Sequence, residues 1–563
     1  MMSNLIHPGL ILIVGGLLFP LFNRGIRSGL ALLLPLISLS VIWLVNPGCH
    51  GSLSVAGFIL HPLFVDKLSR LFVTVFSIMA FAGVLYCFRQ ARKLELSAAL
   101  VYAGAAIGVV LAGDLITLFI FWEIMALAST LVIWSANTTT SRRAGMRYVT
   151  IHLLGGVILM AGIALYVLDT GDYQFTVMHT DKLSTWLILI GFLVNVGAPP
   201  LSAWLPDAYP ETSFSGMVFL SAFTTKTAVY VLLRGFPGTE LLIFVGMYMI
   251  FYGIIYALLE NDMRRILAYS IINQVGFMVC GIGIGTTLAL NGAAAHAFTH
   301  IIYKALLLMS AGSVMYMTGK RKCSDLGGLF QTMPITCICG IVGALAISAF
   351  PLTSGFVSKS MMAQSAADEQ LLVVWLLLQA ASAGVFLHAG IKFPWFVFFQ
   401  KDSGLRPSDP PVNMRLAMAL FAFLCIAIGL LPNQFYRILP YATSYVPYTA
   451  SHVLAQLQLL LFAGLAFFIM LPMMKRTLTI SLDFDWIYRH LFPRLLLVLG
   501  GFTEKVMNGL CQVKVLSRQA ISNSVHRVFS RNGVLSRELS TGITVLLAVL
   551  YLALYMIFYL LLG

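Results

Sequence analysis

Long apolar stretches recur along almost the whole chain, and short polar turns separate them. A helix needs about 20 mostly apolar residues to cross a bilayer, and sixteen stretches are candidates for such helices. They lie at 5–22, 28–46, 66–88, 97–113, 115–135, 147–168, 183–205, 213–234, 240–259, 266–285, 291–316, 332–365, 371–399, 413–431, 454–474 and 541–562. The pattern predicts an all-α polytopic membrane protein with about 16 transmembrane helices.

The composition agrees with this class. Hydrophobic residues make up 59% of the chain and charged residues only 10%, whereas soluble domains carry about 25% charged residues. This excludes a soluble enzyme, a nucleic-acid-binding protein and a secreted disulfide scaffold. The eight cysteines are scattered without a Cys-x-x-Cys pair, so we expect no disulfide framework and no metal site. The first stretch lacks the basic flank and the cleavage pattern of a signal peptide.

Basic residues in the loops predict the orientation. With the N-terminus outside, sixteen Lys and Arg residues fall in one set of loops and five in the opposite set. Because cytoplasmic loops carry the basic excess, the richer set is predicted to be cytoplasmic. The chain is then a multi-pass protein of the bacterial cytoplasmic (inner) membrane with both termini outside. The basic residues of the predicted cytoplasmic loops are Arg24, Arg27, Arg89, Arg92, Lys93, Arg142, Arg143, Arg147, Arg264, Arg265, Lys320, Arg321, Lys322, Lys401, Arg406 and Arg415.

The segment 475–540 is also basic and is predicted to lie on the cytoplasmic side. Within it, residues 482–540 intersperse apolar with basic side chains, which is typical of amphipathic helices that lie along a membrane or along neighbouring spans. A solvated cytoplasmic tail with a helical hairpin fits the pattern equally well.

Two stretches carry a proline inside an apolar run. Pro200 and Pro351 are each followed by Leu and a small hydroxyl residue, and Gly355 comes shortly after the second. Proline removes a helical hydrogen bond, so both helices are predicted to be interrupted. They are the seventh and twelfth stretches and cross in opposite directions, and matching interrupted helices in inverted halves indicate a transporter with a mid-membrane pathway. A structural kink in each helix is the alternative.

Two ionisable residues lie near the middle of apolar stretches. A charge there costs about 2.5–3.5 kcal/mol on insertion scales, so it marks a functional candidate. Glu123 has no ionisable neighbour between Asp114 and Arg142, so any partner must come from another helix. Lys226 lies mid-way along the eighth stretch, and we expect it to form a switching pair with Glu123. A static ion pair, or snorkelling of Lys226 to the interface, is the alternative.

His296, His300 and Lys304 repeat every four residues along the eleventh stretch, so they share one helical face. Imidazole titrates near neutrality and both donates and accepts protons. The stripe therefore predicts a proton pathway, although His296 alone also fits a core histidine bonded to a backbone carbonyl.

Further polar residues extend this predicted pathway. Lys359 follows the second break, and His388 with Lys392 makes another four-residue pair in the thirteenth stretch. Lys392 precedes an aromatic run and is expected near the cytoplasmic exit. Asn273 and Gln274 of the tenth stretch are predicted to take part through bridging water.

Motifs between about 110 and 430 resemble the antiporter-like subunits shared by Mrp-type cation/proton antiporters and respiratory complex I. These motifs are Trp122-Glu123, Pro200–Tyr209, Thr225-Lys226 with Val229-Tyr230, Arg265 with Leu267-Ala268-Tyr269-Ser270, Thr299-His300 with Tyr303-Lys304, and Pro351–Phe356 with Ser358-Lys359. The Thr-Lys spacing is more similar to the D-type subunits of Mrp antiporters. The resemblance implies two inverted five-helix repeats, spans four to eight and nine to thirteen. It also implies a proton relay through Glu123, Lys226, His300, Lys304 and Lys392.

The chain departs from this family in two places. Asn195 stands where the family typically has a lysine that pairs with the glutamate, so Glu123 is expected to pair with Lys226 or to stay largely protonated. A long basic segment and a last span follow the fifteenth. That layout is similar to the complex I subunit with a lateral helix, a part that 482–540 would play over a shorter reach.

The resemblance and the hydropathy together predict six parts. They are an N-terminal three-helix segment (1–95), a first inverted repeat (96–236), a second inverted repeat (237–400), spans fourteen and fifteen (401–474), the basic cytoplasmic or lateral segment (475–540) and the final helix (541–563).

The predicted function is that of a proton-translocating membrane subunit of a multisubunit cation/proton antiporter, similar to the D-type subunits of Mrp antiporters. Other membrane subunits, protons and Na⁺ or K⁺ are the expected partners, with no nucleic acid, no cofactor and no enzymatic activity of its own. The alternative is a proton-pumping, non-redox membrane-arm subunit of a complex I-like (NADH:quinone oxidoreductase-like), hydrogenase-like or inorganic-carbon uptake complex. A non-conducting scaffold that anchors partners through 475–540 is a third interpretation, favoured by Asn195.

Overall fold

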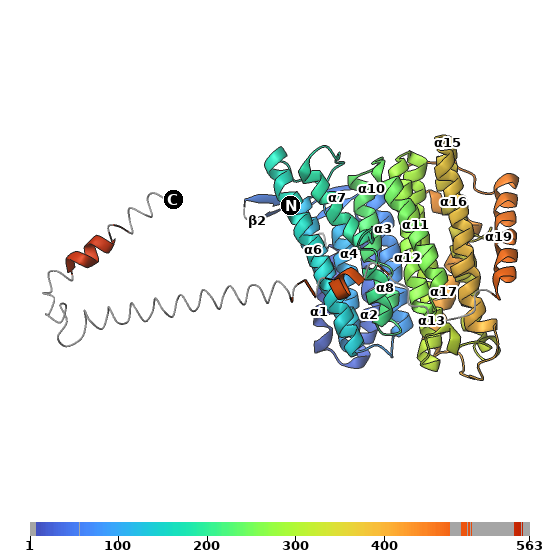
Figure 1. Cartoon of the computed structure of the whole chain (residues 1–563). Coiled ribbons are helices and arrows are strands. Elements are labelled where there is room, and N and C mark those ends of the chain that lie inside the picture. The colour runs from blue at the N-terminus through green and yellow to red at the C-terminus, as the bar shows by residue number, and fades with distance from the viewer. Residues whose placement is uncertain are drawn as a thin grey trace. The chain divides into compact units, whose positions relative to one another are not determined.

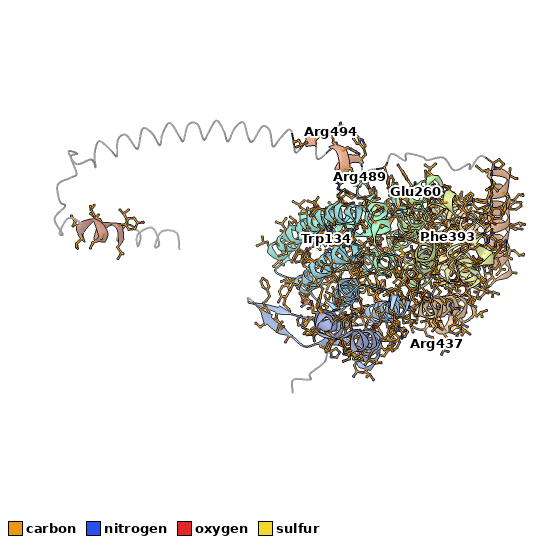
Figure 2. All side chains as sticks on the ribbon, turned by 90° about the horizontal axis from the view of Figure 1, so that it is seen from below. Trp134, Glu260, Phe393, Arg437, Arg489 and Arg494 are labelled. Carbon is orange, nitrogen blue, oxygen red and sulfur yellow. The ribbon has the colours of Figure 1, made fainter. Side chains whose placement is uncertain are left out.

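The computed structural model describes residues 7–472 apart from Ala56, together with 483, 486–491, 494–495, 497, 545–552 and 554. The chain divides into two units, residues 1–485 and 486–563. In the first unit the long helices lie side by side with their axes nearly parallel (Figure 1). Side chains fill the space between them (Figure 2).

The N-terminal part and the first predicted repeat consist of helices and two small hairpins. The strands β1 (Gly48–His50) and β4 (Leu63–Val65) pair antiparallel, as do β2 (Leu53–Val55) and β3 (Phe58–Leu60). The helices are α1 (Pro8–Leu18), η1 (Phe19–Leu21), α2 (Arg24–Leu44), α3 (Lys67–Cys87), α4 (Lys93–Leu111), α5 (Leu115–Trp134), α6 (Thr139–Thr170), α7 (Leu183–Val196), α8 (Trp204–Ala208), η2 (Tyr209–Glu211), α9 (Gly216–Leu220) and α10 (Thr224–Gly235).

The remainder of the first unit is also helical. It contains α11 (Leu241–Leu259), α12 (Met263–Ile284), α13 (Thr287–Thr318), η3 (Cys323–Asp325), η4 (Leu329–Gln331), α14 (Pro334–Ile347), α15 (Ser354–Asp368), α16 (Leu372–Val385), the π-helical turns η5 (Phe386–Lys392) and η6 (Trp395–Phe399), α17 (Val412–Leu430), α18 (Pro432–Tyr436) and α19 (Ala450–Met470).

Within the described residues, twelve helices are long and apolar enough to cross a membrane, and three shorter apolar helices accompany them. These fifteen correspond to the first fifteen predicted stretches, so the chain is an all-α polytopic membrane protein. The three shorter helices are Pro8–Leu21, Leu183–Val196 and Pro334–Ile347. The predicted total of sixteen full spans is not reached among the described residues, because the first helix is short, breaks shorten the seventh and twelfth, and most of the sixteenth lies outside the described residues.

Acidic side chains fix where several spans begin. The Asp66 carboxylate accepts from the Ser69 amide at 2.7 Å, and Asp114 accepts from the Thr117 amide at 2.7 Å. Asp262 caps α12 in a similar way. Each cap satisfies a backbone donor that the helix itself leaves free, which is why these helices start at polar residues at the ends of the apolar runs.

The two interruptions expected from proline are present. Helix α7 ends at Val196, Gly197 takes a left-handed φ of 81°, and the chain turns through the cis Pro199-Pro200 bond before α8. The second break, between α14 and α15, holds Ala349 and Leu352 at φ of 56° and 68°. These left-handed non-glycine residues show that packing, and not local preference, sets the conformation of the loop.

A third interruption was not predicted. The eighth stretch, expected to be one helix over 213–234, is split into α9 and α10 at Ser221–Phe223. The split leaves backbone carbonyls without helical partners, and it begins five residues before Lys226.

Helix α13 occupies the centre of the packing. It contacts α12, α14, α15 and α17 from the later part of the chain, and also α3, α9 and α10 from the earlier part. Nearly all residues from Ala289 to Val314 are buried. The predicted His and Lys stripe therefore lies where the two predicted repeats meet.

The second unit is described only in short pieces. Residues Ile487–Leu491 form a π-helical turn, and residues 545–552 are helical. Most of the lateral helix or cytoplasmic tail predicted for 482–540, and most of the last predicted span at 541–562, fall outside the described residues.

Candidate functional site

The polar stripe of α13 is fully buried, because His296, His300 and Lys304 are each 0% exposed. The Nδ1 atom of His296 hydrogen bonds with Ser358 Oγ of α15 at 3.0 Å. Its Nε2 atom lies 3.2 Å from Gln274 Oε1 of α12, and the Tyr303 hydroxyl donates to the same oxygen at 3.0 Å. Three helices thus meet in one hydrogen-bonded cluster around His296.

His300 lies one turn further along and is held differently. Its ring is 6.1 Å from that of His296, and among the described residues neither ring nitrogen has a hydrogen-bond partner. Lys304 donates to Ser270 Oγ at 2.8 Å and lies 3.5 Å from the Leu267 carbonyl.

Three buried lysines donate to main-chain carbonyls at helix ends. Lys226 Nζ donates to the Ser221 carbonyl at 2.7 Å, and Lys359 Nζ donates to the Ile347 carbonyl at 2.7 Å. Lys392 Nζ donates to the carbonyls at the end of α11, Leu258 at 2.6 Å and Glu260 at 2.7 Å among them. Helix C-terminal carbonyls carry partial negative charge, so the carbonyls at these breaks and ends stabilise the ammonium groups of the three lysines.

Lys392 and His388 lie on the π-helical turn η5. Glu260, whose carbonyl receives Lys392 at the end of α11, is labelled in Figure 2. The Nδ1 atom of His388 hydrogen bonds with the Gly384 carbonyl at 2.8 Å, and its Nε2 atom is buried without a hydrogen-bond partner among the described residues.

The predicted pair of Glu123 and Lys226 is wrong as a direct contact. Within the described part of the chain, no hydrogen bond or ion pair joins them, and Lys226 turns to the Ser221 carbonyl instead. Glu123 Oε1 is buried without a hydrogen-bond partner there. Its carboxyl group packs against α6, where a methyl group on Gly156 would lie 2.1 Å from Oε1. The unpredicted break at Ser221–Phe223 explains the difference, because it frees the carbonyl that Lys226 binds.

Asn195 contacts a residue that the sequence pattern did not single out. Its Oδ1 atom lies 2.7 Å from Nδ1 of His152 on α6. The imidazole is 1% exposed and packs on Tyr148 and Trp204, with ring centroids 4.0 and 4.6 Å away. A weaker signal was present, because His152 lies in the predicted span 147–168 and no ionisable side chain other than tyrosine follows it before Asp169.

The other residues of the site that the sequence did not indicate have uncharged side chains. Ser270, Ser358 and Tyr303 bind Lys304, His296 and Gln274. Asn273, predicted to act through water, donates to the Ile250 carbonyl at 3.0 Å and accepts from Gln274.

Hydroxyl groups connect the neighbourhood of His152 to that of Lys226. The Tyr148 hydroxyl donates to Ser129 Oγ at 3.0 Å and lies 3.4 Å from Thr224 Oγ1. Thr224 in turn hydrogen bonds with the Tyr102 hydroxyl at 2.6 Å. Thr224 begins α10, two residues before Lys226.

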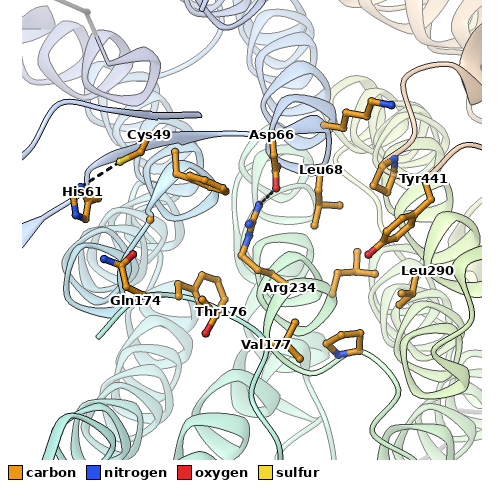
Figure 3. Close-up of a pocket in the computed structure, with 17 residues that line it drawn as sticks. Cys49, His61, Asp66, Leu68, Gln174, Thr176, Val177, Arg234, Leu290 and Tyr441 are labelled. Carbon is orange, nitrogen blue, oxygen red and sulfur yellow. Dashed lines mark hydrogen bonds and ion pairs between the residues drawn. The ribbon is translucent and has the colours of Figure 1, made fainter. Parts of the chain in front are cut away.

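A cavity of about 750 Å³ opens at the loops predicted to face outside (Figure 3). Arg234 at the end of α10 points into it and pairs with Asp66 at 2.7 Å. The guanidinium also donates to the Tyr230 hydroxyl at 2.8 Å. Leu290 and Tyr441 also line it, and Arg234 lies eight residues, about two helical turns, after Lys226 on α10.

A smaller cavity of about 360 Å³ opens at the loops predicted to be cytoplasmic. Glu95, one of its lining residues, is buried and accepts from Ser213 at 2.6 Å and Ser215 at 2.5 Å. Arg321 lies at its edge and pairs with Glu211 and Asp262. Burial raises the pKa of the Asp262 carboxyl, and the Arg321 charge opposes this shift.

The family model described as "NADH:quinone oxidoreductase/Mrp antiporter, TM" matches residues 112–385. The chain is 30% identical over 360 residues to the A/B-type subunit of a probable K(+)/H(+) antiporter of Rhizobium meliloti, covering 60% of this chain and 36% of that protein. It is 33% identical over 272 residues to the D-type subunit of the Na(+)/H(+) antiporter of Alkalihalophilus pseudofirmus, covering 45% of this chain and 55% of that protein. The chain thus spans between about a third and about half of these two relatives.

A solved structure extends the likeness to the whole fold. A chain of the membrane-bound sulfane sulfur reductase, an archaeal respiratory membrane complex, superposes with a TM-score of 0.71 at 24% identity, covering 98% of this chain and 99% of that chain. The family match contains Glu123, Lys226, His300 and Lys304 within its bounds. Over residues 112–385 the chain is therefore similar to the antiporter-like membrane subunits that Mrp antiporters and NADH:quinone oxidoreductases share.

Proposed function

We propose that this chain is a proton-translocating subunit of a multisubunit cation/proton antiporter, similar to the D-type subunits of Mrp antiporters. It works in the bacterial cytoplasmic membrane with other membrane subunits, both termini outside, and is a secondary-active transporter subunit with no catalytic site. The observation that carries the proposal is the fully buried series Lys226, His300 and Lys304 at the junction of the two predicted repeats.

The lysines of this series are arranged to exchange protons. A lysine held by neutral carbonyls and hydroxyls, as Lys226 and Lys304 are, has no carboxylate that fixes its charge, so it can gain and lose a proton as neighbouring charges change. His300 lies one turn before Lys304 on α13, which packs against the helix of Lys226, and imidazole can donate at one nitrogen while it accepts at the other. Protons would thus pass from Lys226 through His300 to Lys304, and on towards Lys359 and Lys392.

Buried polar atoms without protein partners support a hydrated path. Leaving such an atom unsatisfied costs about 1–3 kcal/mol, and buried water usually meets this need. In the described part of the chain such atoms include Trp122 Nε1, Glu123 Oε1, His152 Nε2, Asn195 Nδ2, Ser202 Oγ, Tyr209 OH, Thr227 Oγ1, both His300 nitrogens, Ser354 Oγ, Ser360 Oγ and His388 Nε2, and others belong to Arg27, Arg70, Ser97, Thr332, Arg415, Tyr445 and His452. Water at these atoms would connect the titratable groups that direct contacts leave apart.

The two cavities would serve as the ends of the path in the first half. The smaller one, with Glu95 and Arg321, faces the predicted cytoplasmic loops, and the larger one, with Asp66 and Arg234, faces the predicted outside loops. Lys392, bound to the carbonyl end of α11, would end the path of the second half.

A second candidate function keeps the fold and changes the driving reaction. The chain would then be a proton-pumping membrane-arm subunit of a redox-driven complex, an interpretation favoured by the fold match that spans 98% of the chain. Purification in mild detergent distinguishes the two. Iron–sulfur subunits that co-purify with the chain would favour the redox-driven complex, and only small membrane subunits would favour the antiporter.

The transport function is tested in vesicles that carry the whole complex. Glu123→Gln and Lys304→Met each remove a charge with little change in shape, and we expect ion-driven pH change to fall by about a hundredfold in both. The matched controls are Glu369→Gln and Lys320→Ala, because both residues are exposed. Full activity in Glu123→Gln and Lys304→Met, with the complex assembled, would contradict the proposal.

A further inference from the structure

His152 is held in a geometry that leaves one nitrogen free for a proton. Its Nδ1 atom lies 2.7 Å from Asn195 Oδ1, and because an amide oxygen only accepts, Nδ1 carries the hydrogen. The Nε2 atom is then the acceptor of the neutral ring. It is buried and has no hydrogen-bond partner among the described residues, while Tyr148 and Trp204 pack on the ring and fix its plane.

The titratable groups around His152 leave Glu123 as its natural proton partner. Helix α6 packs against α5, α7, α8 and η2. Helix α7 contributes Asn195 and no ionisable residue. On α8, Asp207 pairs with Arg147 of α6 at 2.7 Å. On η2, Glu211 pairs with Arg321 at 2.9 Å, and Tyr209 is neutral at ordinary pH.

Glu123 is the remaining carboxyl, and it lies over the same face of α6. Its Oε1 atom is at the surface of Gly156, four residues after His152, so about one helical turn of 5.4 Å separates the two positions along the helix. Both Glu123 Oε1 and His152 Nε2 are buried without hydrogen-bond partners among the described residues. A water molecule between them would satisfy both atoms.

We propose that His152 is the proton-binding partner of Glu123 in the first half, positioned by Asn195. The inference rests on the proposed transport function and adds a residue to it. A proton leaves the Glu123 carboxyl through water and binds His152 Nε2, so the carboxyl becomes a carboxylate and the ring an imidazolium. The proton then leaves Nε2 towards the hydroxyl groups of Tyr148 and Thr224 that lead to Lys226. When the proton is bound, His152 therefore carries a positive charge beside Asn195, whose own side chain is neutral.

The pH profile of transport tests this role. In Asn195→Asp a carboxylate would lie beside Nδ1–H and favour the protonated ring, so the acidic limb of the profile should move up by about one pH unit. In His152→Gln, ion-driven pH change in vesicles with the whole complex should fall about tenfold or more. His452→Gln is the matched control, since that histidine lies on α19 and bonds Gln364 at 3.0 Å.

Each outcome decides the inference. An unchanged acidic limb in Asn195→Asp, or full transport in an assembled His152→Gln complex, overturns the role of His152. If His152→Gln does not assemble, the Asn195→Asp profile decides alone. Glu123→Gln separates this inference from the proposed function. Loss of transport in Glu123→Gln together with full transport in His152→Gln would reject only the role of His152. Full transport in both variants would reject the proposed pathway as well.

Discussion

At the scale of single residues, main-chain carbonyls at helix ends are hydrogen-bond partners of three of the buried lysines. Lys226, Lys359 and Lys392 all donate to carbonyls at helix ends. The pair of Lys226 and Glu123 was predicted because the two side chains carry opposite charges. A carbonyl becomes available only where a helix breaks, and the break before Lys226 carries neither proline nor glycine, so nothing in the sequence marked it.

The hydroxyl that holds Lys304 is predicted to matter for transport. Ser270→Ala removes the oxygen 2.8 Å from Nζ, at a cost of about 1–3 kcal/mol if the ammonium is left without that partner. We therefore expect slower ion-driven pH change in vesicles carrying the complex. Ser310→Ala is the matched control on the helix that carries Lys304, where the hydroxyl binds the Thr336 carbonyl. Equal rates in Ser270→Ala and Ser310→Ala would contradict this assignment.

The candidate site was only partly predictable from these residues. His296, His300 and Lys304 were found because a spacing of four places them on one face whatever surrounds the helix. Two partners of His296, Gln274 and Ser358, come from other helices, 22 and 62 residues away in sequence, and no local pattern indicates such contacts. His152 carried a weaker signal, because it is an ionisable residue inside a predicted span but has Arg147 five residues before it.

At the scale of elements, the broken helices are built by close backbone contacts. Proline marked the first two breaks in the sequence, because it cannot continue the hydrogen bonding of a helix. The loop between α14 and α15 is compact enough that a methyl group on Gly355 would lie 1.8 Å from the Ala346 carbonyl oxygen. Glycine is therefore required there by the approach of two backbones, and no side-chain movement can relieve the clash.

Gly355→Ala is accordingly predicted to destabilise the protein. Overpacking in a tight interior costs about 1–3 kcal/mol or more, and here the neighbour is backbone. The measurement is the Tm of the purified complex in detergent, which should fall. Gly464→Ala is the control, because its nearest neighbour, a Phe386 side-chain atom, lies at an ordinary 3.5 Å. A Tm equal to that of Gly464→Ala would contradict this prediction, because it would show that the loop accommodates the methyl group without loss of stability.

At the scale of the whole molecule, the position of the helices was the most predictable feature. Fifteen apolar stretches coincide with helices because a run of about 20 apolar residues has few other stable arrangements in a membrane. The central place of α13 was not predictable, because it depends on contacts with helices from both predicted repeats. The inverted repeats and the orientation of the termini stay predictions.

Asp483 ties the chain after α19 back to the helices α11 and α12. The carboxylate is buried and accepts from the hydroxyls of Tyr252 and Tyr269, each at 2.6 Å. In the sequence this residue is one of few acids in a basic segment, and no pattern marks it as a contact. The contact fixes the start of that segment against the second predicted repeat.

Asp483→Ala is expected to lower the stability of the complex. Hydrogen bonds to a charged group contribute about 1.5–3 kcal/mol, so the Tm in detergent should fall. The exposed pair of Asp402 and Arg406 offers the comparison, because surface ion pairs contribute about 0–1 kcal/mol, and Asp402→Ala should change the Tm little. If both variants melt alike, the buried contact at Asp483 does not anchor the segment.

The central claim is that the buried polar residues form one hydrated path. The most direct measurement is a map of the intact complex at a resolution that shows ordered water. We predict water within about 3 Å of both His300 nitrogens, of Glu123 Oε1 and of His152 Nε2, in a file that continues to Lys226. Dry apolar contacts around these atoms, with no water between Lys226 and Lys304, would contradict the account.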